Sequence, residues 1–112
     1  FSYEEFIRNT SIATSTMIVE RKIIKDIFFT NTEICEDYFF KCKILKKVKY
    51  AFCLSELLAT YRIRERSLQS NKFKNFSMIW KINSRYNKLG FLDNIISLMY
   101  ISFNSLLKYG FK

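Results

Sequence analysis

The scarcity of glycine and proline is the feature that most constrains how this chain can fold. Among its 112 residues there are no prolines and only two glycines, Gly90 and Gly110. Phosphate-binding loops of α/β enzymes usually need glycine, because only glycine lets the backbone come so close to a ligand. The chain holds no such loop, which is unusual for a complete α/β enzyme. Both glycines follow helical patterns, where glycine commonly ends a helix.

Composition excludes several classes of protein. Hydrophobic residues make up 49% of the chain, which is enough for a sizeable core and argues against wholesale disorder. The chain has no histidine, so catalytic triads and metal sites built on histidine are excluded. Its three cysteines form no closely spaced pair, so we expect packing groups in a reducing compartment rather than a disulfide framework.

The first residues and the apolar segments indicate whether the chain has a signal peptide or a membrane span. It starts at Phe1, and charged residues interrupt its first segment, so we expect no signal peptide and a piece of a longer product. No run reaches the roughly 18 apolar residues that a membrane span needs. We therefore expect the last apolar segment to be able to lie on a membrane but not to cross it.

Spacing and capping signals predict five helical segments. Ser2 and Glu5 form a capping box that opens the first, and Gly90 and Gly110 are expected to close the last two. The segments are, in order, 2–10, 20–28, 36–47, 72–89 and 92–109. The two long C-terminal segments are separated only by a short link, so they are expected to form a hairpin or a sharp elbow.

Three segments rich in β-branched and aromatic residues predict strands. They are SIATSTMIV (11–19), VKYAFCL (48–54) and ELLATYRI (56–63). Helices and strands together indicate an α/β fold, or α+β with a helical tail.

The acidic pair Glu36–Asp37 is the sharpest candidate for chemistry. It stands in the first turn of a predicted helix, where the helix dipole favours negative charge. A carboxylate held at a helix start can act as a general base toward a substrate hydroxyl. The alternative is a capping pair that only stabilises the helix.

A basic loop follows the last predicted strand. Arg62, Arg64 and Arg66 stand at alternate positions, so an extended backbone would place them on one face. Such a face could bind a diphosphate, because the arginine fork matches phosphate oxygens. The alternative is a solvated basic surface loop.

A second basic set recurs at helical spacing in the C-terminal part: Lys74, Lys81, Arg85 and Lys88. A cationic stripe flanked by aromatic residues can meet an anionic membrane surface. The alternative is the solvent-exposed side of an amphipathic helix.

Four segments, taken in order, resemble the C-terminal half of a bacterial family 2 glycosyltransferase. They are SYEEFIRNTSIATSTMIVERK, CEDYFFKCKILKK, LLATYRIRERSLQSNK and WKINSRYNKLGFLDNIISLMYISFNSLLKYGFK. The second is similar to the Glu-Asp motif of the family, and the third to its Tyr-Arg loop. The fourth resembles the paired helices that end enzymes of surface-polysaccharide synthesis.

The resemblance implies part of a GT-A fold, with a short mixed sheet and two long C-terminal helices. It implies inverting transfer of a sugar from a nucleotide-sugar to a saccharide or lipid-linked hydroxyl acceptor, in polysaccharide or lipopolysaccharide synthesis. By the same resemblance Asp37 is the catalytic base, and Glu36 orients it or contacts the acceptor. Arg62, Arg64 and Ser67 would belong to the loop over the donor diphosphate. Mg²⁺ or Mn²⁺ is expected in the complete enzyme.

The chain departs from that family in lacking an Asp-x-Asp motif, which there holds the metal. We therefore expect no metal ligand in this chain and a single-domain fragment over residues 1–112, inactive alone. Residues 1–70 would be the acceptor-side half with the catalytic base, and residues 71–112 the helical hairpin. We expect a cytoplasmic protein, peripheral to the inner face of the plasma membrane.

Two other functions compete with the enzyme. One is a small basic module that binds nucleic acid; the other is a module that binds a membrane surface. The basic residues are spread over three segments without a nucleic-acid-binding motif, so we expect no nucleic acid as a partner.

Overall fold

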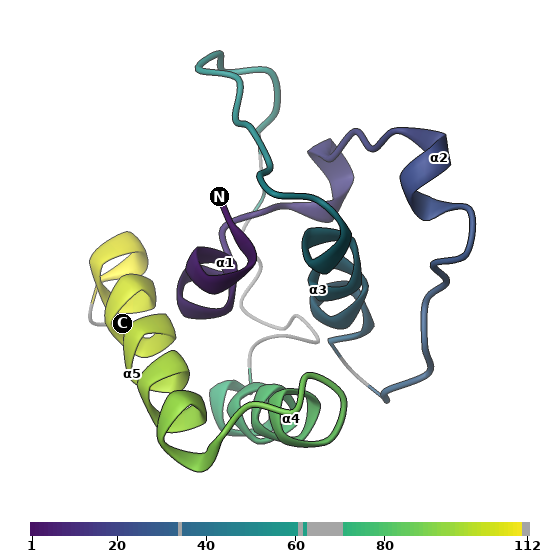
Figure 1. The fold of residues 1–112 in the computed structure, drawn as a ribbon. Coiled ribbons are helices and arrows are strands. Elements are labelled where there is room, and N and C mark those ends of the chain that lie inside the picture. The colour runs from purple at the N-terminus through teal and green to yellow at the C-terminus, as the bar shows by residue number, and fades with distance from the viewer. Residues whose placement is uncertain (34, 61, 63–70, 111–112) are drawn as a thin grey trace.

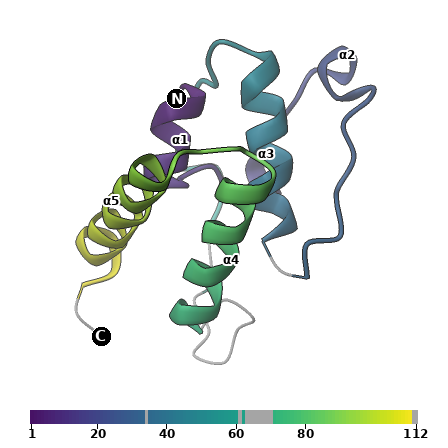
Figure 2. The ribbon, with the colours of Figure 1, turned by 60° about the horizontal axis from the view of Figure 1, so that its bottom comes forward.

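The computed structural model describes residues 1–33, 35–60, 62 and 71–110. Its elements are α1 (Tyr3–Asn9), the short 3₁₀ helix η1 (Thr14–Thr16), α2 (Arg21–Ile24), α3 (Glu36–Lys47), α4 (Lys72–Arg85) and α5 (Phe91–Tyr109). Helix α1 lies between α3 and α5, and α4 lies across the open side of this group (Figure 1). The view in Figure 2 shows the same order, with α5 and α3 on opposite sides of α1.

The local signals set the ends of α1 and α3. Ser2 Oγ accepts a hydrogen bond from the Glu5 amide (3.2 Å), and the Glu5 carboxylate accepts one from the Ser2 amide (2.7 Å). This reciprocal pair confirms the predicted capping box. Helix α3 begins at Glu36 and ends at Lys47, as predicted, with acidic residues in its first turn and lysines in its last.

The prediction for the junction between α4 and α5 was wrong in detail. Helix α4 ends at Arg85, four residues before the predicted Leu89. The amides of Tyr86 and Asn87 both donate to the Ile82 carbonyl (2.9 Å each), which stops the helix there. Gly90 therefore does not cap α4 but stands at the N-cap of α5. Gly110, with φ of 70°, does cap α5 as predicted.

The prediction of a short mixed sheet was also wrong: the described residues contain helices and no strand. Part of the first predicted strand forms η1, and residues 48–60 run without regular structure. Phe1 and Ala51 exchange two backbone hydrogen bonds (2.7 and 2.8 Å), but no ladder continues from them. A strand needs a neighbour along its length, and β propensity alone does not supply one.

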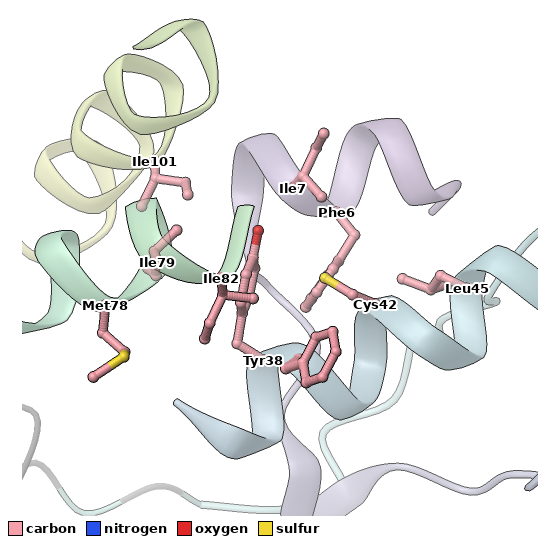
Figure 3. Packing of buried hydrophobic residues seen from close by; sticks show 10 residues of the cluster. Phe6, Ile7, Tyr38, Cys42, Leu45, Met78, Ile79, Ile82 and Ile101 are labelled. Carbon is pink, nitrogen blue, oxygen red and sulfur yellow. The ribbon is translucent and has the colours of Figure 1, made fainter. Parts of the chain in front are cut away.

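One hydrophobic core joins α1, α3, α4 and α5. Phe6 of α1 is fully buried and stacks on Tyr38 of α3, with ring centroids 5.5 Å apart. Ile82 of α4 and Ile101 of α5 close the same cluster (Figure 3). A smaller cluster of Ile27, Phe40 and Ile44 packs the 17–27 segment against the other side of α3. The helices of residues 71–110 thus share a core with α1 and α3.

A buried network of amides and hydroxyls joins α4 and α5 to that core. Asn83, fully buried, accepts a hydrogen bond from the Tyr38 hydroxyl (2.8 Å). Its own amide donates to Asn94 Oδ1 (3.2 Å) and to Ser97 Oγ (3.3 Å). Ser97 in turn donates to the Ile7 carbonyl of α1 (2.5 Å). Asn83 of α4 therefore bonds directly to α3 and α5, and it reaches α1 through Ser97.

Helix α5 buries polar side chains and exposes many of its apolar ones, which is unusual for an amphipathic helix. Its inner side carries Asn94 and Ser97, which are almost completely buried. Its outer side is apolar and exposed, and we call it the α5 outer face: Leu92, Ile96, Met99, Phe103, Leu106 and Leu107. None of the helices in the described ranges is both long enough and apolar enough to cross a membrane.

Candidate functional site

The site begins at the turn that precedes α3. Glu33 and Cys35 both have positive φ, 67° and 60°, although neither is glycine. Cys35 is the N-cap of α3 and makes no capping hydrogen bond with its side chain. The acidic residues of the first turn, Glu36 and Asp37, therefore supply the negative charge that the helix start favours. Left-handed backbone at such residues is uncommon and is enriched at functional sites.

Asp37 is held through one of its carboxylate oxygens. Its Oδ2 accepts a hydrogen bond from Thr14 Oγ1 (3.1 Å) in η1 and another from Lys41 Nζ (2.9 Å), one turn on in α3. The Asp37 side chain keeps 35% of its surface exposed. Asp37 thus lies in the first turn of a helix, as predicted. It also lies beside the 11–19 segment, which is not a strand.

Lys41 supplies the charge that Asp37 meets. Only 5% of this residue is exposed, which is rare for lysine. Its ammonium also donates to the Ile12 carbonyl (2.8 Å) and lies 5.9 Å from the centre of the Phe6 ring. The ammonium is therefore enclosed by α1, the 12–14 segment and Asp37.

These contacts set the protonation of Asp37. Burial is the largest single influence and favours the neutral acid. The hydrogen bond and charge of Lys41, with hydrogen bonds from Thr14 and the Tyr38 backbone, together outweigh it. The pKa of the Asp37 carboxyl is therefore held below its usual value, and the group is ionised at neutral pH.

Glu36 faces a different part of the surface. It lines an open hollow of about 350 Å³ formed with the loop before α3: Phe29, Thr30, Asn31, Thr32 and Glu33. Asn31, Thr32 and Glu33 also line a second hollow of about 140 Å³, whose other wall is α4 and includes Lys81 and Arg85. Glu36 therefore faces the hollow before α3, whereas Asp37 faces η1.

The other predicted residues lie apart from Asp37 or outside the described residues. Arg62 is exposed, whereas Arg64 and Ser67 fall outside the described residues. Lys74, Lys81 and Arg85 are exposed on α4, but Lys88 lies beyond the helix in the link to α5, so the predicted stripe is shorter on the helix than expected.

Cys35 directly precedes the acidic pair in the sequence. Burial, followed by the charges of Asp37 and Glu36, raises the pKa of the Cys35 thiol to about 11, so it is a protonated packing group at neutral pH. In the part of the chain that the structure describes, no three Cys, Asp or Glu side chains could hold a metal ion together. The described residues therefore offer no site for Mg²⁺ or Mn²⁺, which we expect only in the complete enzyme.

Sequence reasoning missed Lys41 and Thr14. The spacing of four between Asp37 and Lys41 is the usual one for an ion pair on a helix and could have been noticed. Burial of the lysine could not, because it depends on Ile12 and Phe6, which are distant in sequence.

Comparison with known proteins bears on the identity of the chain. It is 34% identical over 110 residues to an uncharacterized glycosyltransferase of Haemophilus influenzae, a match that covers 96% of this chain and 43% of that protein. It is 29% identical over 91 residues to the putative teichuronic acid biosynthesis glycosyltransferase TuaG of Bacillus subtilis, covering 81% of this chain and 36% of that protein.

No family model and no solved structure matches the chain. The chain thus spans less than half the length of these two relatives, although each match covers most of the chain. The comparisons bear out the coarser part of the resemblance: the chain is similar to part of two proteins named as glycosyltransferases.

Proposed function

We propose that the chain is the acceptor-side, C-terminal part of an inverting family 2 glycosyltransferase and that Asp37 is its general base. The observation that carries the proposal is the state of the Asp37 carboxylate. It is ionised, fixed through Oδ2 by Thr14 and Lys41, and still partly open to solvent. A base must be held in place and must reach a substrate hydroxyl, and the fixed, partly exposed carboxylate supports this role.

The proposed reaction is a single displacement. The acceptor hydroxyl oxygen forms a bond to the anomeric carbon while the bond from that carbon to the donor diphosphate breaks. The hydroxyl proton passes to the Asp37 carboxylate, and the nucleoside diphosphate leaves with the bonding electron pair. Attack from the face opposite the leaving group inverts the anomeric centre. Arg62, Arg64 and Ser67 are proposed to contact the diphosphate.

The proposed activity belongs to a longer protein. Mg²⁺ or Mn²⁺ and the nucleotide would be held outside this chain, so the chain alone is expected to be inactive. The name of the Bacillus subtilis relative, a putative teichuronic acid biosynthesis glycosyltransferase, supports polysaccharide synthesis as the setting. A saccharide or lipid-linked acceptor and a cytoplasmic location are parts of the proposal.

Asp37→Asn in a full-length glycosyltransferase that carries this segment tests the proposal. The amide keeps the shape but removes the basicity, so turnover should fall by roughly two to four orders of magnitude. Donor affinity should stay near normal. Asp26→Asn, at an exposed aspartate after α2, is the matched control and should leave turnover unchanged. Near-normal turnover in Asp37→Asn would remove the residue from the mechanism.

The α5 outer face favours a second function beside the first, binding to a membrane surface. It is an apolar strip on a 19-residue helix. Exposed cations precede this helix in the chain, on α4 and in the link to α5: Lys74, Lys81, Arg85 and Lys88. Each basic residue near an anionic leaflet contributes about 1 kcal/mol of binding.

Sedimentation with anionic vesicles tests this function. The double substitution Lys81→Glu and Arg85→Glu should markedly reduce pelleting with vesicles that contain phosphatidylglycerol, and it should leave folding unchanged because both residues are exposed. Equal pelleting of the native and substituted chains would show that these basic residues do not contribute to membrane binding.

A further inference from the structure

We propose that Lys41 is a positioning residue for Asp37: its buried ammonium fixes Oδ2, so that Oδ1 is the oxygen that receives the acceptor proton. The inference rests on the proposed role of Asp37 as the base. It adds a second residue, and a specific atom, to that role.

The geometry gives Lys41 three fixed neighbours. Its ammonium donates to Asp37 Oδ2 at 2.9 Å and to the Ile12 carbonyl at 2.8 Å, and it lies over the Phe6 ring at 5.9 Å. A lysine with only 5% of its surface exposed has lost nearly all its hydration, so these contacts must replace it. An ammonium enclosed in this way cannot follow the carboxylate into solvent, and it therefore restricts Asp37 to one orientation.

The two carboxylate oxygens of Asp37 are consequently unequal. Oδ2 accepts from both Lys41 and Thr14, which between them occupy its accepting positions. The side chain keeps about a third of its surface exposed, at 35%. Oδ1 has no side-chain partner among the described residues, although the Tyr38 backbone also donates to this carboxylate, so Oδ1 is the oxygen assigned to a hydroxyl outside the chain.

The chemistry of the pair favours orientation over base strength. A cation beside a carboxylate makes it a weaker base, so Lys41 is not there to strengthen Asp37. It keeps the carboxylate ionised and correctly placed, and correct placement of a reacting group can lower a barrier by several kcal/mol. A capping residue would need no such partner, because backbone amides alone would satisfy it.

Lys43 provides a matched control on the same helix. Its ammonium also donates to a backbone carbonyl, that of Phe28 (2.9 Å), and to a hydroxyl, that of Thr30 (2.6 Å). It differs from Lys41 in having no carboxylate among these partners. Loss of the Lys43 charge should therefore reproduce any general effect on α3 without the effect on Asp37.

Carbon-detected NMR titration of the side-chain carboxyl groups in the 112-residue chain tests the contact without any activity. The chain has only three aspartates, Asp26, Asp37 and Asp93, which simplifies assignment of the Asp37 signal. Lys41→Met keeps the length of the side chain and removes its charge, so the Asp37 titration should move to higher pH. Lys43→Met should leave it in place. If Lys41→Met does not fold, Thr14→Val, at an exposed residue, should produce a smaller shift in the same direction.

The pH profile of the full-length enzyme tests the consequence for catalysis. In Lys41→Met, kcat should fall about tenfold with little change in KM, and the acidic limb of kcat should move upward in pH. A purely structural role would lower kcat without moving that limb. An unchanged Asp37 titration in both Lys41→Met and Thr14→Val would overturn the inference, whereas normal turnover in Asp37→Asn would overturn the proposed function itself.

Discussion

Helices α3 and α5 lie on opposite sides of α1 (Figure 2), and they bury different mixtures of apolar and polar side chains. Helix α3 buries aromatic and aliphatic groups together with one ammonium, that of Lys41. Helix α5 turns Asn94 and Ser97 inward and leaves its apolar outer face exposed.

The difference teaches where each helix obtains its stability. Helix α3 follows the common rule, in which apolar burial drives packing and the buried charge is paired. Helix α5 packs Leu98 and Ile101 against the core and adds a buried set of hydrogen bonds from Asn94 and Ser97, while its outer face stays exposed. Buried polar groups stabilise a fold only when every partner is present, so this side of the molecule is the more sensitive to a single change.

Asn83→Leu should have the largest effect on stability. It removes the acceptor of the Tyr38 hydroxyl and the donor to Asn94 and Ser97, which leaves several buried polar groups without partners. We expect a loss of about 3 kcal/mol in the free energy of unfolding, measured by urea denaturation. Ser77→Ala, at an exposed position of the same helix, should change it by less than about 0.5 kcal/mol. A loss below about 1 kcal/mol in Asn83→Leu would mean that apolar packing holds α5.

The helices could be predicted where their signals are local. The Ser2–Glu5 capping box and the charges at both ends of 36–47 act within one turn, so sequence reasoning located α1 and α3. The end of α4 could not be predicted in this way. The carbonyls of Ile82 and Asn83 accept from the link that follows α4, and the Asn83 side chain is held by Tyr38 in α3 and by Asn94 and Ser97 in α5.

The predicted strands failed for a related reason. The 48–54 segment has the composition of a strand, but pairing depends on a neighbour that composition does not specify. In the described residues Val48 only caps α3, by donating to the Ile44 carbonyl, and Ala51 pairs with Phe1, while Phe52 and Leu54 remain exposed.

The site was predicted only in part. The acidic pair Glu36–Asp37 stands out in sequence because charge at a helix start is a local signal. The division of the pair between two surfaces, and the partners Thr14 and Lys41, depend on how η1 lies against α3. The role of each residue in catalysis stays a prediction.

We expect the second largest effect from acid, which should weaken hydrogen-exchange protection in α3 more than in α5. The pKa of Asp37 is lower in the folded than in the unfolded chain, so its contribution to stability is complete above the unfolded value of about 4 and is lost as pH falls through the folded value. The amides and hydroxyls around Asn83 do not titrate in that range. Between pH 7 and pH 2.5, hydrogen-exchange protection should therefore fall more in the first turn of α3 than at the junction of α4 with α5.

Lys41→Met is the control for that comparison. Without the ammonium, Asp37 loses the partner that lowers its pKa, so the difference in protection between pH 7 and pH 2.5 should shrink at the start of α3. Equal acid sensitivity of both regions in the native chain would show that the Lys41–Asp37 contact does not determine the local response.

Substitutions on the α5 outer face should have the smallest effect on the isolated chain. Leu92 is 73% exposed and Leu107 is 70% exposed, so replacing either by Gln removes little buried apolar surface. Each change should alter the free energy of unfolding by less than about 0.5 kcal/mol, measured by urea denaturation. Ile101→Ala, on the inner side of the same helix, is the contrasting variant: it is 8% exposed and should cost about 2–4 kcal/mol. Leu92→Gln and Leu107→Gln could instead destabilise the chain as much as Ile101→Ala. The α5 outer face would then be packed against another surface in solution, rather than exposed.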